Sequence, residues 1–374
     1  MHRTLLLLLA VLAGVACNTR TSQGAAAAPP IESAVDATQL NDVARFLAGI
    51  PGRPESPLHA LESEASWIAW AENFKQTWAE ALRTQFEPVA VFQRTQVSSG
   101  AATVFYPFSG PDILYMLRFF PAASVYLMAG LEPAGDPPLP AVFSRQTLPA
   151  ELESWRKALY DVFHRSFFVT SAMAQSFRRG AKGSGGLAPA ILLLLARDGY
   201  TIDSIRFGEF SATGDFEPLP AGAAHHVIEV RFHPENNAVK TLYYSSGDLG
   251  GFVGTQTLGA FLHQRGEFAT LIKSASYVPH RPEFAPFRDL VLANTSLLLQ
   301  DDTGIPWRLL EPKTWDVTLY GEYSVPDPPF RGYYQTDMAA AFKARSAPRP
   351  LGFSIGYGYN RRTSSMMLAR RRSK

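Results

Sequence analysis

The chain of 374 residues contains one cysteine, and only 18% of its residues are charged. A single cysteine excludes an intramolecular disulfide and a zinc site built from several cysteines. Hydrophobic residues make up 46% of the chain and aromatic residues 12%, which excludes an intrinsically disordered protein because such chains have too little apolar surface to bury. Beyond the N-terminus no apolar run spans a bilayer, since residues 190–196 fall far short of about 20 residues.

The first 17 residues have the pattern of an export signal that ends at the single cysteine. Arg3 supplies a positive charge, residues 5–12 form a short apolar core, and small residues precede Cys17. This pattern resembles the lipobox of bacterial lipoproteins, in which cleavage before the cysteine exposes it for lipidation. We therefore predict a signal peptide over residues 1–16 and a lipid on Cys17. The alternative is an ordinary signal peptide, which would leave a secreted protein without a lipid.

The residues after Cys17 indicate where such an anchor would place the protein. Asn18 follows the cysteine, and the resemblance to lipoproteins implies that a residue other than Asp at this position favours the outer membrane, with the protein facing the periplasm. Residues 17–37 are small and polar and include four consecutive alanines and two prolines, which predicts a flexible tether. The expected partner is therefore the membrane, through the lipid.

The opposite end of the chain is basic. Residues 361–374 carry six Lys and Arg side chains and no acidic one, which predicts a disordered tail; docking on anionic lipid or phosphate is the alternative. Without this tail and Arg3, the 35 basic residues of the chain fall to 28, against 33 acidic residues. The body lacks the basic excess that nucleic-acid binding requires, so we expect no nucleic-acid partner.

Helical and strand patterns are interleaved between the two ends, which favours one α+β body over residues 38–360, with a mixed or antiparallel sheet. The first half is rich in helix patterns, and a helix expected over about 60–84 carries an aromatic stripe typical of a buried face: Trp67, Trp70, Phe74, Trp78. The second half is rich in strand patterns, the last of them expected over 351–359. A glycine-rich loop over 180–186 permits two lobes without requiring them.

Several motifs of the body occur together: FYPFSGPDILYMLRFFPAASVYLMAGLEPAG at 105–135, LYYSSGDL at 242–249, LLLQDDTGIPWRLL at 297–310, WDVTLYGEY at 315–323 and LGFSIGYG at 351–358. Together they resemble a family of uncharacterised bacterial secreted proteins and lipoproteins. The resemblance covers roughly residues 100–360. It implies an envelope protein of one architecture and no activity or site residue.

Ser109 and Asp112 stand where an expected strand turns into an expected helix. The spacing Ser-x-x-Asp is that of a capping box, in which both side chains bond main-chain N–H groups of the first helical turn, and Pro111 just inside the helix supports it. The alternative is a functional pair, because a Ser and an Asp at such a turn suit catalysis or anion binding. The glycines of a nucleophile elbow are absent around Ser109. We predict the cap and keep the site open.

Two clusters of ionisable residues have side chains that suit a metal or an acid site. One lies in an expected strand and comprises His225, His226, Glu229 and His233. Those that share a strand face are four residues, or about 13 Å, apart, which is too far for one ion, so we predict no metal site and no cofactor. The other, Asp301-Asp302, precedes Thr303-Gly304 and is typical of a turn.

Two classes of function remain open from the sequence. The first is a non-catalytic envelope component that binds a protein partner or a glycan, the latter by stacking on tyrosines and tryptophans if they are exposed: Tyr243, Tyr244, Tyr333, Tyr334, Trp307 and Trp315. The second is an envelope hydrolase with Ser109 and Asp112, completed by an unplaced histidine, His225 or His280. A histidine within hydrogen-bond reach of Ser109 would favour the hydrolase.

Overall fold

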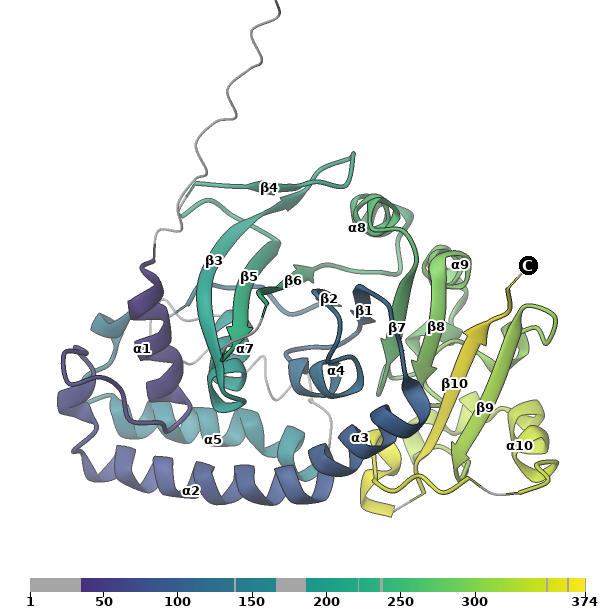
Figure 1. Cartoon of the computed structure of the whole chain (residues 1–374), viewed down its shortest axis with the longest axis horizontal. Coiled ribbons are helices and arrows are strands. Elements are labelled where there is room, and N and C mark those ends of the chain that lie inside the picture. The colour runs from purple at the N-terminus through teal and green to yellow at the C-terminus, as the bar shows by residue number, and fades with distance from the viewer. Residues whose placement is uncertain are drawn as a thin grey trace, which may run out of the picture. The chain divides into compact units, whose positions relative to one another are not determined.

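The computed structural model describes residues 35–137, 139–165, 186–220, 222–235, 238–347, 349–361 and 363–373 (Figure 1). They belong to one compact unit, Glu32–Lys374. Its described strands form a ten-stranded sheet in the order β4-β3-β5-β6-β2-β1-β7-β8-β10-β9. The mixed sheet, packed with helices, confirms the predicted α+β class. The signal peptide, Cys17, most of the tether and nearly all of the 180–186 loop lie outside the described residues.

Five neighbouring strands at the centre of the sheet are parallel. In sheet order they are β6 (Lys240–Ser246), β2 (Val125–Gly130), β1 (Thr103–Pro107), β7 (Phe268–Ile272) and β8 (Thr295–Gln300). From β1 the chain adds β2 on one side and returns later to add β7 on the other. The strand order therefore reverses between β1 and β7, and in open parallel sheets such a point leaves a crevice at the carboxyl ends of the strands.

Antiparallel strands extend the sheet on both sides. One flank consists of β3 (Tyr200–Phe210), β4 (Phe216–Pro218) and β5 (Val227–Pro234), with β5 beside β6. The other consists of β9 (Trp315–Gly321) and β10 (Ser365–Arg371), with β10 beside β8. The strands β3, β5 and β6 thus form an antiparallel meander.

Helices cover both faces of the sheet, and each face has its own apolar core (Figure 1). One core is shared with α1 (Ala37–Leu47), α2 (Ala65–Ala81), α3 (Glu87–Phe92), α4 (Ile113–Phe119), α5 (Leu148–Arg165) and α7 (Ala188–Arg197). The other is shared with α8 (Phe252–Gln264), α9 (Ala285–Asn294) and α10 (Thr336–Lys343). The crossover α4 and the crossovers α8 and α9 therefore lie on opposite faces.

The aromatic stripe of α2 is buried, as its spacing predicts: Trp67, Trp70, Phe74 and Trp78 are each at most 7% exposed. Two of its indole N–H groups also donate hydrogen bonds to carbonyl groups at the end of α1. Trp67 Nε1 donates to Phe46 O at 3.1 Å, and Trp70 Nε1 donates to Leu47 O at 3.0 Å. The last carbonyl groups of a helix lack hydrogen-bond partners within it. These bonds therefore satisfy carbonyl groups at the end of α1 and join α1 to α2.

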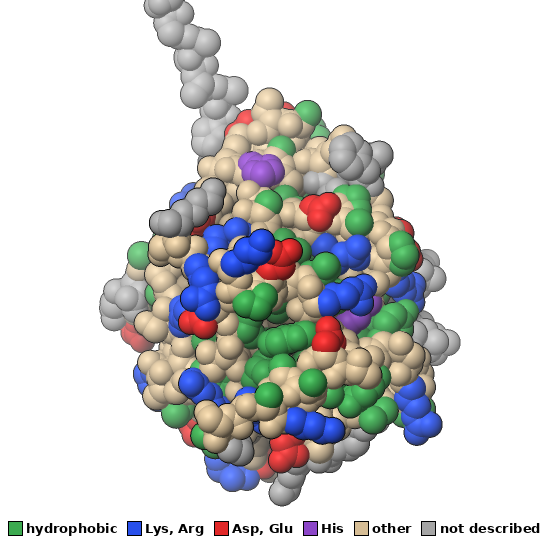
Figure 2. Space-filling view, turned by 90° about the vertical axis from the view of Figure 1, so that its right-hand side faces the viewer, with side chains coloured by type: hydrophobic (Ala, Val, Ile, Leu, Met, Phe, Trp, Pro, Cys, Tyr) green, Lys and Arg blue, Asp and Glu red, His purple; other side chains and the backbone are tan. Residues whose placement is uncertain are grey.

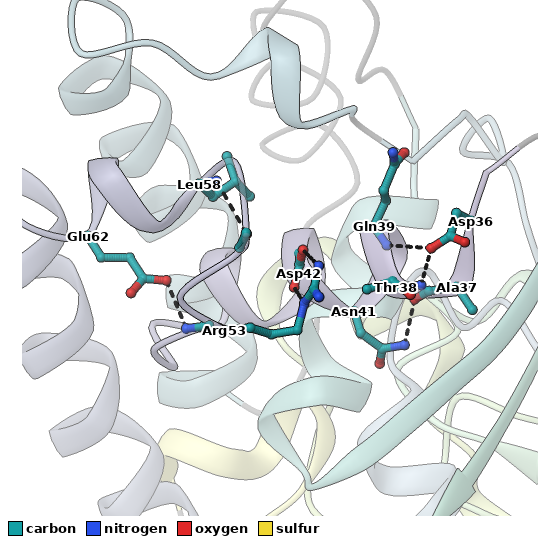
Figure 3. Close-up of polar contacts among 11 residues, drawn as sticks. Asp36, Ala37, Thr38, Gln39, Asn41, Asp42, Arg53, Leu58 and Glu62 are labelled. Carbon is teal, nitrogen blue, oxygen red and sulfur yellow. Dashed lines mark hydrogen bonds and ion pairs between the residues drawn. The ribbon is translucent and has the colours of Figure 1, made fainter.

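Polar contacts fix the first helix, and Figure 3 shows those at its start and with the segment that follows it. Asp36 caps α1 by accepting from the main-chain N–H of Thr38 at 2.6 Å. Asn41 pairs with the main chain of Ile202 in β3 through both its amide nitrogen and its amide oxygen, at 2.7 and 3.0 Å. The buried Asp42 receives two bonds of 2.9 Å from Arg53. The first described helix is thus held in place by side-chain contacts at its start and along its length.

The prediction of a disordered tail over 361–374 is wrong, because β10 lies in this segment and pairs with strands on both sides. Met366 to Ala369 are at most 3% exposed. The arginines that suggested a solvated tail serve as donors instead: Arg370 bonds Gln96 O and Val97 O, and Arg371 bonds Thr295 O and Leu292 O. Composition alone did not reveal that these side chains bond carbonyl groups of neighbouring elements.

The last strand expected, 351–359, is also absent. This segment is irregular and ends in a 3₁₀ helix, η9 (Gly356–Arg361). Its alternating large and small residues suit a strand, but β10 takes the place beside β9.

On the side of the molecule that carries β9 and α10, Lys and Arg side chains, interspersed with acidic ones, surround a central group of apolar side chains (Figure 2). Among the described residues, no helix meets the length and apolarity needed to cross a membrane.

Candidate functional site

A cavity of about 1020 Å³ lies where the strand order reverses. Four of the loops that line it follow the carboxyl ends of β1, β2, β6 and β7, as the topology requires. The 3₁₀ helices η8 (Pro328–Tyr333) and η9 add aromatic side chains from a later part of the chain. The position and size of this cavity make it the candidate ligand site of the molecule.

Asp112 lines this cavity and is held by two donors from neighbouring strands. Lys273 Nζ, just after β7, lies 2.7 Å from Asp112 Oδ2, and the Tyr106 hydroxyl of β1 donates to the same oxygen at 2.9 Å. The side chains of Lys273 and Asp112 are 1% and 2% exposed. Burial, together with the nearby Asp112 carboxylate, raises the pKa of Tyr106 well above its usual value, so this tyrosine remains a hydrogen-bond donor.

The second oxygen of this carboxylate has a different environment. Asp112 Oδ1 is buried and has no hydrogen-bond partner among the described residues. A buried carboxylate oxygen without a donor costs free energy, on the order of 1–3 kcal/mol. A buried ion pair also adds little net stability, because desolvation opposes the Coulomb attraction. The arrangement therefore suits a ligand that supplies the missing donor better than it suits a purely structural role.

The predicted capping box is wrong. Asp112 begins α4 without a side-chain bond to the helix, and Ser109 Oγ donates to Gly110 O at 3.0 Å and Ala129 O at 3.4 Å. A cap is worth about 1 kcal/mol, whereas removing the partner of a buried charge costs about 3–5 kcal/mol. The need of Lys273 for a buried counter-charge therefore decides where Asp112 points.

The two loops beside the ion pair have strained backbones. Phe108, before Ser109, has a φ of 58°, and in the loop after β7 Ser274, Ser276 and Tyr277 have φ values of 54°, 51° and 54°. Positive φ costs a non-glycine residue on the order of 1 kcal/mol or more, and such residues concentrate at binding and catalytic sites. The strain therefore falls on the loops that hold the cavity open.

Asp301 and Thr303, in the turn after β8, support the loop that follows β7. Asp301 Oδ2 accepts from Ser274 N at 2.8 Å, and Thr303 Oγ1 accepts from Ala275 N at 2.7 Å. The predicted turn over 301–304 is present, but the next element is the 3₁₀ helix η7 (Trp307–Leu309) and not the second strand of a hairpin. This turn thus positions one wall of the cavity.

Three groups behind that wall have shifted pKa values. Burial, reinforced by the neighbouring Asp301, raises the pKa of Asp302 to about 7, and Tyr277 donates a hydrogen bond to its Oδ2. Burial raises the pKa of Asp301 as well. Burial, with Arg308 nearby, lowers the pKa of His280 to about 4, and its Nε2 has no hydrogen-bond partner among the described residues.

The structure does not bring the predicted hydrolase residues together. Ser109 and Asp112 both line the cavity, but no histidine is among the described residues that line it. His225 lies against Phe207, with its Nδ1 3.2 Å from Ala223 O. Ser109 Oγ donates to carbonyl oxygens and has no histidine partner among the described residues. The Ser-His-Asp arrangement that the hydrolase hypothesis needs is therefore not formed.

The remaining candidates also have structural partners. Glu229 pairs with Arg206 at 2.6 Å and accepts from the Tyr243 hydroxyl at 2.8 Å, His226 pairs with Glu209, and His233 pairs with Asp203. Within the described ranges, no group of His, Cys, Asp and Glu is placed to hold a metal ion. Of the aromatic residues predicted to stack on a glycan, Tyr243, Tyr244 and Trp315 are at most 8% exposed and belong to the core. Trp307 and Tyr333 are half-buried, and Tyr334 is 38% exposed.

Lys273 is the site residue that sequence reasoning missed. It follows β7, whose sequence FATLI is buried at every position and therefore lacks the alternation of a half-buried strand. A five-residue apolar run between two helical patterns was the available signal. The lysine itself gives no signal of a buried site, because lysines are mostly exposed in folded proteins.

The comparisons with known proteins add nothing to the description of this cavity. No family model matches the chain, and no match was found among curated proteins or among solved structures. The cavity and its ion pair are therefore the basis on which a function can be assigned.

Proposed function

We propose that this protein is a lipid-anchored component of the bacterial cell envelope that binds a small amphiphilic molecule in the cavity at the carboxyl ends of β1, β2, β6 and β7. The observation that carries the proposal is Asp112, a residue that lines the cavity and whose buried Oδ1 has no hydrogen-bond donor among the described residues. Apolar side chains around it, including Phe108, Leu249 and Phe284, suit the rest of such a ligand.

Binding is proposed in preference to hydrolysis because the cavity supplies recognition but no activated nucleophile. Ser109 is bonded to carbonyl oxygens, and a hydroxyl in that state has no base to take its proton. The export signal and Cys17 support the envelope location. The proposed location is the outer membrane, with the protein facing the periplasm.

A matched pair of glycine variants tests the proposal. Gly247 lines the cavity, and a Cβ placed on it would meet open space, so Gly247→Trp should fill the cavity with little strain. Gly100 is equally open but lies outside the lining residues, so Gly100→Trp is the control. The full chain, purified in mild detergent, is screened by thermal unfolding against a panel of water-soluble amphiphiles.

A true ligand stabilises the wild-type protein and Gly100→Trp, by about 2.7 kcal/mol at 100 times its Kd, and fails to stabilise Gly247→Trp. The shared detergent background cancels between the two variants. A panel in which every stabilising compound acts equally on both would show that the cavity is not a binding site.

A further inference from the structure

The ionisable side chains that line the cavity are predominantly acidic. Among the described residues that line it, four are acidic, Asp112, Glu132, Asp248 and Glu283, and two are basic, Lys273 and Arg281. The charge of Lys273 is compensated within the cavity by its ion pair with Asp112. The lining therefore has two formal negative charges in excess, one of them on Glu132, which is only 8% exposed. Such a lining attracts cations and disfavours anions.

Asp112 Oδ1, the oxygen without a donor, is a specific acceptor for a cation that the acidic lining attracts. Both Lys273 and Tyr106 donate to Asp112 Oδ2, which leaves Oδ1 as an acceptor. An ionised carboxylate can only accept, so its partner must bring an N–H or O–H group. A charged donor forms a bond roughly twice as strong as a neutral one.

Aromatic rings supply the second half of the recognition. Phe108 and Phe284 meet edge to face with centroids 5.9 Å apart, and Phe330 stacks on Tyr357 at 5.2 Å; all four line the cavity. Ring faces attract both apolar groups and organic cations. The cavity therefore combines a polar floor, an acidic rim and aromatic walls.

We infer that the ligand is a protonated organic amine with an apolar body, whose ammonium group donates to Asp112 Oδ1 while its body lies against the aromatic walls. The inference rests on the proposed binding function and adds the chemical class of the ligand. An inorganic or carboxylic anion is the opposite class, and an uncharged alcohol of the same shape is the intermediate one.

Three probes of one skeleton separate these classes: 4-phenylbutylamine, 4-phenylbutanol and 4-phenylbutyrate. Their dissociation constants are measured by calorimetry on the full chain in detergent, with Gly247→Trp as the blank for micelle partition. We expect the amine to bind at least 10-fold more tightly than the alcohol and the acid to bind most weakly. Asp112→Asn should remove most of the advantage of the amine over the alcohol.

Because Asp112→Asn disturbs a buried ion pair, two exposed rim positions provide a second test that does not depend on it. Asp248→Asn keeps the acceptor for Gly250 N and should weaken amine binding, whereas Arg281→Gln should strengthen it, each by about 1.5- to 5-fold at low salt. If Asp248 and Arg281 had only structural roles, the two substitutions would not change amine binding in opposite directions.

The outcomes separate failure of the amine inference from failure of the binding function. Tighter binding of the acid than of the amine, or weaker amine binding in Arg281→Gln, overturns the amine inference and leaves the cavity a ligand site. Failure of all three probes while other panel members bind overturns it as well. If no compound of any class distinguishes Gly247→Trp from Gly100→Trp, the proposed function itself fails.

Discussion

Lys273 and Asp112 form an ion pair of 2.7 Å at the point where the strand order of the sheet reverses, with both side chains at most 2% exposed. Their loops follow β7 and β1, strands that are neighbours in the sheet but far apart in the chain. The Lys273 ammonium also lies 4.2 Å from the centroid of the Tyr115 ring, which gives it a second favourable contact. The pair thus joins the two sides of the crevice.

Removing one member of this pair should cost more than removing both charges. Asp112→Asn and Lys273→Met each leave a buried charge without its partner, so each should lower the free energy of unfolding by about 3–5 kcal/mol. The double variant leaves no such charge and should be less destabilised than either single variant. Urea unfolding of the four proteins measures the coupling.

The exposed pair Glu80–Arg83 provides the control for this cycle, because both of its side chains are more than half exposed. Glu80→Gln should leave stability nearly unchanged, since solvent screens such pairs. Additive effects of Asp112→Asn and Lys273→Met would show that the two groups do not depend on each other.

The chain should not tolerate loss of its last strand. Deletion of residues 364–374 removes β10 from between β8 and β9, and with it the buried side chains of Met366, Met367 and Leu368. We expect loss of a cooperative thermal transition or insoluble protein, measured by circular dichroism, because an interior strand supports both of its neighbours. Deletion of 373–374 alone is the control, and a native-like transition in the longer deletion would contradict the placement of β10.

Asp302→Asn should become more stabilising as the pH rises. The pKa of Asp302 is about 7 in the folded protein, against an ordinary value of 3.8, so the folded state binds this proton more tightly than the unfolded chain. Its contribution is therefore fully present below about pH 4 and is lost as the pH rises through about 7. Asparagine resembles the protonated form and escapes this loss. Urea unfolding between about pH 4 and about pH 8 compares the two proteins.

His280 provides a control of opposite sign. Its folded pKa of about 4 lies below the ordinary value of 6.5, so its contribution rises with pH over this interval. His280→Gln should flatten that rise while Asp302→Asn removes a decline. Parallel stability curves for the wild type and Asp302→Asn would mean that Asp302 is already ionised in the folded state near pH 4.

Cys17→Ala should release the protein from the membrane. The signal-like segment ends at this cysteine, which is the only thiol available for lipidation. The variant should move to the soluble fraction and lose labelling by a fatty-acid analogue, because a single signal peptide without a lipid leaves no anchor. Unchanged partitioning and labelling would rule out the lipid anchor.

Local patterns in the sequence predicted most of the elements around the site. The apolar run of β1, the turn at Ser109 and the helix after Asp112 all lie where the pattern indicates. The same pattern misassigned the role of Asp112, because a cap needs only neighbours in the chain whereas the actual partner follows β7. The prediction of a disordered tail over 361–374 failed for a related reason, because its arginines bond carbonyl groups of other elements.

The sequence by itself determined which segments are apolar enough to be buried and where the chain turns, because side-chain spacing reports the exposure of a helix or strand directly. It thereby determined the buried stripe of α2 and the strand-to-helix turn that carries Ser109 and Asp112. Only the tertiary structure decided that β1 and β7 are neighbours, and hence that Asp112 meets Lys273 in a cavity. The pairing order of parallel strands depends on long crossover connections, and no local spacing encodes which distant strand will lie alongside.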